Sequence, residues 1–149
     1  MTDPRMDLPS LVPDAIQAVL GLEKHVRSNL DHGLLELLKL RASTMNGCAH
    51  CVDMHATSLV DAGEDVRRVV AVAAWRESPF FTERERVVLE LTEAVTRLGE
   101  HGMPDDVWAA GERELGQQTL ATVIIAIATI NVWNRIAIST RAETPPLTR

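Results

Sequence analysis

The chain has 149 residues, a formal net charge of −6 and 46% hydrophobic residues. This length favours a single domain over residues 1–149, and the apolar fraction supports a core that needs no covalent staple. The acidic balance, with no basic cluster beyond pairs such as Arg67 and Arg68, argues against a nucleic-acid-binding surface. The N-terminal stretch MTDPRMDLPSLVPDAIQ contains three prolines where a signal peptide needs a continuous apolar run, so we expect a cytoplasmic protein.

Helical periodicity extends along the chain, and no stretch alternates apolar and polar residues as a strand does. We therefore predict an all-α fold. A first helix is expected over residues 13–28, opened by Pro13, and a second from about residue 34. Asn46 and Gly47 end the second helix, and Asn46 also suits the N-cap of a third helix that runs to about residue 62.

The later helices are marked by their own start and stop signals. Glu64 and Asp65 place negative charge at the start of a fourth helix. Thr82 and Glu85 match a capping box for a fifth helix over residues 83–98. A sixth helix begins near residue 104, and a long apolar helix follows Gly116 to about residue 139. Polar residues near its end favour a buried helix over a membrane span, and residues 1–12 and 142–149 are expected to be flexible tails.

Both cysteines lie in the segment NGCAHCVDMHAT, residues 46–57. Because cytosolic thiols are kept reduced, a close pair there favours catalysis or metal binding over a permanent bridge. On an ideal helix Cys48, Cys51 and His55 lie within about 60° of one another, whereas His50 projects roughly 160° from Cys48. If Asn46 is the N-cap, the helix dipole favours a thiolate at Cys48, but the histidine spacing favours Cys51.

This arrangement suits two-electron thiol chemistry. An imidazole one helical turn from a thiol can accept its proton. The resulting thiolate attacks a peroxide to give a sulfenic acid, which a second thiol within reach condenses to a disulfide. An external dithiol must then reopen the bridge by exchange, so a reducing partner is implied.

The segment ELLKLRASTMNGCAHCVDMH resembles the core of alkylhydroperoxidase D (AhpD) in the carboxymuconolactone decarboxylase superfamily. The resemblance implies an all-α, AhpD-like fold of about six to seven helices in a homo-oligomer, a trimer or hexamer. It implies that Glu36 and His55 form a proton relay, directly or through a water, that deprotonates Cys51 for attack on an alkyl hydroperoxide. Cys48 would then be the resolving thiol, and His50 matches a further active-site position.

The same resemblance implies recycling by a lipoyl-type dithiol on a partner protein. Related decarboxylases that open the lactone of carboxymuconolactone lack the cysteine pair, so its presence here points away from that activity. No bound cofactor is required by the sequence, and neither a membrane nor nucleic acid is expected as a partner.

Two other functions are compatible with the same residues. Cys48, Cys51 and His55 could supply three ligands to a metal ion. Alternatively, the protein could be a non-catalytic redox sensor whose disulfide changes its oligomeric state. Glu36 by spacing alone is explained equally well by an ion pair with Lys39, three residues along the same helix.

Overall fold

The computed structural model describes residues 3–147 and confirms the all-α prediction. Among these residues there are no strands, only an isolated bridge between Gly99 and Gly102. The helices in chain order are α1 (Leu8–Leu11), α2 (Pro13–Asn29), α3 (His32–Asn46), α4 (Ala49–Asp61), α5 (Val66–Ala71), the short 3₁₀ helix η1 (Val72–Ala74), α6 (Glu83–Thr96) and α7 (Asp105–Thr140).

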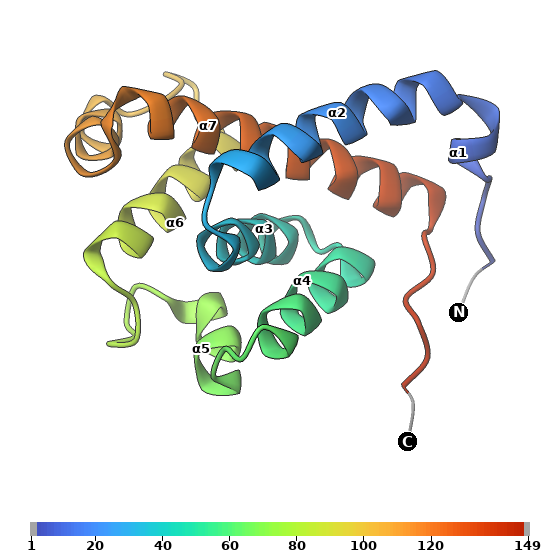
Figure 1. The fold of residues 1–149 in the computed structure, drawn as a ribbon, viewed down its shortest axis with the longest axis horizontal. Helices are drawn as coiled ribbons and strands as arrows, with labels where there is room; N and C mark the ends of the chain where they lie inside the picture. The colour runs from blue at the N-terminus through green and yellow to red at the C-terminus, as the bar shows by residue number, and fades with distance from the viewer. Residues whose placement is uncertain (1–2, 148–149) are drawn as a thin grey trace.

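Helix α3 lies at the centre of the molecule, where α4, α6 and α7 all contact it (Figure 1). Its residues from Leu34 to Leu40 are all buried, including the charged Glu36 and Lys39, so α3 is buried around its whole circumference rather than along one stripe. Helix α2 packs along α7 on one side of α3, and α5 follows α4 on the opposite side. This central position lets α3 contribute residues to both the core and the site.

Two hydrophobic clusters make up the core. The larger lies between α2, α3, α6 and α7 and includes Val26, Leu38 and Ile127, all fully buried. The smaller lies between α3, α4, α5 and α6 and includes Leu59 and Trp75. Helix α3 contributes residues to both clusters, and these contacts fix its orientation against α4.

Capping residues and glycines in the sequence mark several of the observed helix boundaries. The capping box at Thr82 and Glu85 is confirmed, with both reciprocal hydrogen bonds present. Gly116 interrupts α7 with φ 72° and ψ 161°, so two helices meet there as the sequence predicts. Gly63, just beyond the end of α4, has φ 90°, a left-handed conformation that glycine adopts readily after a helix.

The expectation that Asn46 is the N-cap of the third helix is wrong. Asn46 is the last residue of α3, Gly47 is its left-handed C-cap, and Cys48 is the N-cap of α4. The Asn46 side chain instead donates hydrogen bonds to the Oδ1 atoms of Asn131 (2.9 Å) and Asn134 (2.8 Å) in α7. These long-range partners outweigh a local capping role.

The first and last described segments of the chain, next to α1 and after α7, lie on the same side of the molecule (Figure 1). Helix α1 falls within the first expected tail, and Arg5 is bonded to α7 through its backbone N–H and the Thr140 carbonyl, 2.8 Å apart. The flexibility of residues 1–12 and 142–149 stays a prediction, and residues 1–2 and 148–149 lie outside the described residues.

Helix α7 is long and apolar enough to span a membrane by length and composition. Within its most apolar stretch, however, 44% of the residues are buried inside the protein. Its inward-facing residues, among them Leu120, Val123 and Ile130, belong to the larger core cluster. This agrees with the interpretation of the segment as a core helix.

Candidate functional site

The two cysteines lie at the corner between α3 and α4, where they form a disulfide. Gly47 has φ 71°, a left-handed conformation that lets the chain turn directly from one helix into the next. The Cys48 N–H donates to the Ser43 carbonyl at 3.0 Å, and the Cys51 N–H lies 3.4 Å from Cys48 Sγ. The two Cα atoms are 5.3 Å apart, within the range that a disulfide spans without backbone movement.

This geometry changes the electrostatic comparison of the two sulfurs. Because Cys48 is the N-cap, Cys51 is the third residue of α4 and lies in its first turn. The unpaired N–H groups and positive dipole end of a helix favour a thiolate throughout that turn. The dipole therefore favours both sulfurs rather than Cys48 alone, and it no longer opposes the histidine spacing.

His55 and Glu36 form a buried pair across the α3–α4 contact. His55 Nδ1 lies 2.8 Å from Glu36 Oε2, and both side chains are at most 3% exposed. Burial alone would raise the pKa of Glu36. The hydrogen bond from His55 and the positive charges of His55, Lys39 and Arg27 outweigh burial and lower that pKa. Glu36 is thus a carboxylate that accepts the His55 Nδ1–H.

The other nitrogen of His55, Nε2, is not engaged by the described part of the protein. His55 Nε2 is buried and has no hydrogen-bond partner among the described residues. A cavity of about 440 Å³ is lined by both His55 and Cys51. When His55 is neutral and its Nδ1–H is bonded to Glu36, the free lone pair is on Nε2, which can then accept a proton.

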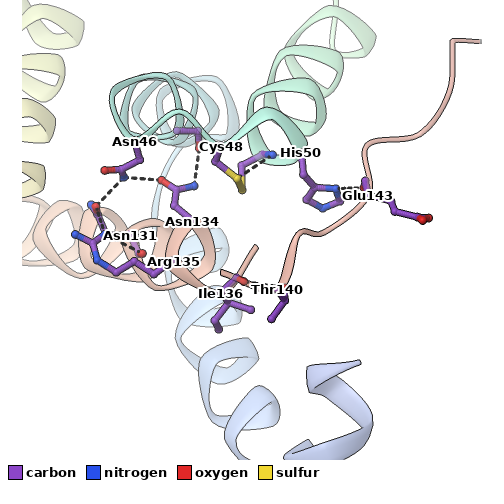
Figure 2. Close-up of a disulfide and its surroundings, with 11 residues drawn as sticks. Asn46, Cys48, His50, Asn131, Asn134, Arg135, Ile136, Thr140 and Glu143 are labelled. Atoms are coloured by element: carbon purple, nitrogen blue, oxygen red, sulfur yellow. Dashed lines mark hydrogen bonds between the residues drawn. A yellow bond between two sulfur atoms is a disulfide. The ribbon is translucent and has the colours of Figure 1, made fainter. Parts of the chain in front are cut away.

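His50 lines the same cavity from the first turn of α4. Its ring bonds the C-terminal segment, because Nδ1 donates to the Glu143 carbonyl at 2.6 Å (Figure 2). The ideal-wheel angle between His50 and Cys48 does not describe this corner, since Cys48 precedes the helix with non-helical φ and ψ. The structure therefore brings His50, Cys51 and His55 to one cavity.

The cavity is mainly apolar, with several charged side chains in its wall. Helix α7 contributes Trp133 and Ile136, and α4 contributes Met54. The segment before α2 contributes further apolar side chains, including Met6 and Leu8. Asp7, just before α1, also lines the cavity, and three further charged side chains come from α2 and α3: Glu23, Arg27 and Lys39. Such a cavity can hold an apolar molecule with a small polar or reactive group.

Sequence reasoning missed this charged wall. Lys39 is only 1% exposed, and its Nζ forms an ion pair with Glu23 Oε1. The only signals were the i,i+4 spacing of Glu23 and Arg27 on α2 and a lysine within a leucine-rich helix. Neither signal reveals that α2 brings its charges beside Glu36.

The metal-binding alternative has little geometric support. Over residues 3–147, no group of three or more His, Cys, Asp or Glu side chains is arranged to hold a metal ion. The disulfide also leaves neither sulfur as a thiolate ligand. A Cys48, Cys51 and His55 metal site would thus require the reduced protein.

Relatives place the chain among known sequences. Residues 11–94 match the carboxymuconolactone decarboxylase family. The chain is 31% identical over 136 residues to the uncharacterized protein YdfG of Bacillus subtilis, an alignment that covers 91% of this chain and 92% of YdfG.

Solved structures of other proteins have the same fold as this chain. A protein of unknown function from Agrobacterium tumefaciens, ATU0492, superposes with a TM-score of 0.93 and 38% identity, over 97% of this chain and all of that chain. Its description suggests the antioxidant defence protein AhpD. The debrominase Bmp8 shares the fold alone, with a TM-score of 0.80 and 19% identity over 91% of this chain and 74% of its own. The chain is therefore an AhpD-like member of the carboxymuconolactone decarboxylase family.

Proposed function

We propose that this protein is a thiol-dependent peroxidase that reduces alkyl hydroperoxides through Cys48 and Cys51. The observation that carries the proposal is the shared cavity of Cys51 and His55, with His55 held by a buried carboxylate on its far side. A base, a nucleophile and an apolar space for an organic substituent therefore meet at one place. The description of ATU0492 as an AhpD candidate supports the same activity.

In the first half-reaction, His55 Nε2 accepts the proton of the Cys51 thiol, and Glu36 stabilises the imidazolium through Nδ1–H. The thiolate attacks the distal peroxide oxygen and the O–O bond breaks. Cys51 becomes a sulfenic acid, and the leaving alkoxide takes the proton from His55 and departs as an alcohol. The peroxide is reduced by two electrons and the sulfur is oxidised by two.

In the second half-reaction, the Cys48 thiol attacks the sulfenic sulfur, an S–S bond forms and water leaves. This step needs the two sulfurs within bonding reach, as the disulfide at the α3–α4 corner shows them to be. A lipoyl-type dithiol on a partner protein then supplies two electrons and two protons by thiol–disulfide exchange. His50, at the cavity wall, is proposed to contact the peroxide or the incoming dithiol.

The test measures consumption of an organic hydroperoxide with dihydrolipoamide as the reductant. Cys51→Ser should abolish turnover, and Cys48→Ser should allow one turnover at most. His55→Ala and Glu36→Gln should reduce the rate by about 10² or more, the usual contribution of general acid–base catalysis. His101→Ala and Glu77→Gln, both exposed, are matched controls and should leave the rate unchanged. Equal turnover in wild type and Cys51→Ser would remove the proposal.

The two alternatives have separate tests. Elemental analysis of reduced protein purified without added metal decides the metal-binding alternative, since a site needs about one equivalent of metal per chain. Comparison of the oligomeric state of oxidised and reduced protein decides the redox-sensor alternative. A change of state without peroxide turnover would favour the sensor.

We further propose that the protein is a single-domain homo-oligomer, a trimer or hexamer, located in the cytoplasm. Several large apolar side chains are exposed in the single chain, on α2 (Leu20 and Leu22) and on α7 (Ile125 and Val132). Apolar surface of this kind on one small domain is typical of a chain that associates. Light scattering at micromolar concentration should give a mass of at least three chains, and a monomer would contradict this.

A further inference from the structure

A network of charged side chains, largely buried except for Arg27, lies behind the Glu36–His55 pair. Lys39 Nζ is 3.8 Å from Glu36 Oε1 and forms an ion pair with Glu23 Oε1. Arg27 Nη1 is 3.5 Å from Glu36 Oε1, and Arg27 Nε is 2.8 Å from Glu23 Oε1. The two oxygens of Glu36 thus have different surroundings: Oε2 faces His55, and Oε1 faces two cations.

Lys39 is the member of this network whose burial is hardest to explain by stability. Burial lowers the pKa of Lys39, and the partial compensation from Glu23 does not restore it. A lowered lysine pKa means that folding disfavours its charge. The neighbouring positions Leu38 and Leu40 are buried leucines, so an apolar side chain would suit this helix better. The charge at residue 39 therefore calls for a function.

We propose that Lys39, anchored by Glu23, is a positioning residue that keeps Glu36 ionised and turned toward His55. This inference rests on the proposed function, because it assigns Lys39 to the same proton relay. The charged groups that face Glu36 are His55 from α4, Arg27 from α2 and Lys39 from its own helix. Among the described residues, no charged side chain of α6 or α7 is within ion-pair distance of Glu36.

Of the two cations near Glu36 Oε1, Lys39 should have the larger effect. The Arg27 side chain is 47% exposed, so solvent and salt screen its charge. Lys39 and Glu36 are both 1% exposed, and their interaction is screened much less. Without Lys39, Glu36 would take up a proton at higher pH, and its hydrogen bond could no longer support a positive charge on His55.

The test uses the pH dependence of Cys51 alkylation by iodoacetamide, which needs no peroxide. A Cys48→Ser background leaves one thiol and retains an oxygen at the N-cap. In Lys39→Met, the ratio of the rate at pH 5.5 to the rate at pH 8 should fall by about threefold to tenfold, because one pKa unit corresponds to a factor of ten. Lys39→Arg keeps the charge and should retain most of the ratio.

Leu40→Met is the matched control, since it alters packing on the same buried helix without changing charge. If Lys39→Met does not fold, Lys39→Gln removes the charge while keeping a hydrogen-bond donor. A ratio that is unchanged or increased in the neutral variant overturns the inference, as does an equal loss in Lys39→Arg. If wild type shows no peroxidase turnover, the proposed function fails, but the alkylation ratio still decides the role of Lys39.

Discussion

Glu36 and His55 are nineteen residues apart in the sequence and meet across the α3–α4 contact, with His55 Nδ1 2.8 Å from Glu36 Oε2. Their two helices are joined at a corner of only Gly47 and Cys48. The same corner that brings the cysteines together therefore also sets the distance between the carboxylate and the imidazole. The geometry of the thiols and that of the relay are consequences of one turn.

The Glu36–His55 pair predicts how the free energy of unfolding depends on pH. Glu36 has a pKa below its ordinary value of 4.5, although burial alone would raise it, because His55, Lys39 and Arg27 favour the carboxylate. A lowered pKa contributes stability that is fully present above 4.5 and is lost as the pH falls through the lower folded value. In urea unfolding, Glu36→Gln should be less stable than wild type at pH 7, and the difference should shrink below pH 4.5.

Two other carboxylates, Glu85 and Glu93, also have lowered pKa values and therefore also lose stabilisation as the pH falls. Burial alone would raise the pKa of Glu85 and of Glu93, but the hydrogen bonds and positive charges around each carboxylate, led by the hydrogen bonds from Arg68 and Trp75 respectively, together lower it. The acid sensitivity of wild type thus has several sources, and the comparison with Glu36→Gln isolates one of them. A difference in unfolding free energy that stays constant from pH 7 to acid pH would contradict the assignment of Glu36 as a carboxylate.

The break within α7 predicts opposite effects for two glycine substitutions. Gly116 has φ 72° and ψ 161°, a region that side chains other than glycine rarely adopt, so Gly116→Ala should cost about 1–3 kcal/mol. Gly21 lies within α2 with open space around an added Cβ, so Gly21→Ala should stabilise by about 0.5–1 kcal/mol. Thermal unfolding measures both. Equal effects of the two substitutions would mean that backbone conformation does not control them.

Most of the fold could be predicted because its boundaries are marked locally. The Thr82 capping box and the break at Gly116 each depend on residues within one turn. Asn46 was misassigned because asparagine suits both a helix end and an N-cap. Its actual partners, Asn131 and Asn134, are more than eighty residues away.

The site was predictable to the extent that it is local. Cys48, Cys51 and His55 lie on one short segment, so their spacing indicates their chemistry directly. The pairing of Glu36 with His55 requires the packing of two helices, and only a family resemblance indicated it in advance. The burial of Lys39 beside Glu23 depends on how α2 lies against α3, which no local pattern specifies. Likewise, the cavity needs α7 and the N-terminal segment to close it.

The central position of α3 predicts a large cost for a cavity in its core face. Leu38 is fully buried in the larger cluster, so Leu38→Ala should reduce the free energy of unfolding by about 2–5 kcal/mol. Leu98 is 64% exposed, and Leu98→Ala should change the free energy of unfolding by less than about 0.5 kcal/mol. Urea unfolding at neutral pH compares the two. A loss below 1 kcal/mol for Leu38→Ala would show that α3 is not the centre of the cooperative unit.

A polar network beneath Cys48 predicts that α7 stabilises the thiol corner from below (Figure 2). Asn134 is fully buried; it accepts a hydrogen bond from Asn46 and donates one to Ser43 Oγ at 3.0 Å. Ser43 in turn accepts the Cys48 N–H through its carbonyl. Asn134→Ala leaves buried polar groups without partners, so it should cost about 1–3 kcal/mol of unfolding free energy.

The same substitution should also loosen the corner locally, which hydrogen exchange can detect. In Asn134→Ala, the Cys48 amide should exchange faster than in wild type by more than the loss of global stability accounts for, because Ser43 is no longer held against α7. Asn29→Ala is the matched control and should leave exchange at Cys48 unchanged, because Asn29 is exposed and its side chain donates to the His25 carbonyl, away from the thiol corner. If Cys48 exchange tracks global stability alone in both variants, the α7 network supports the fold as a whole and has no specific effect on the thiol corner.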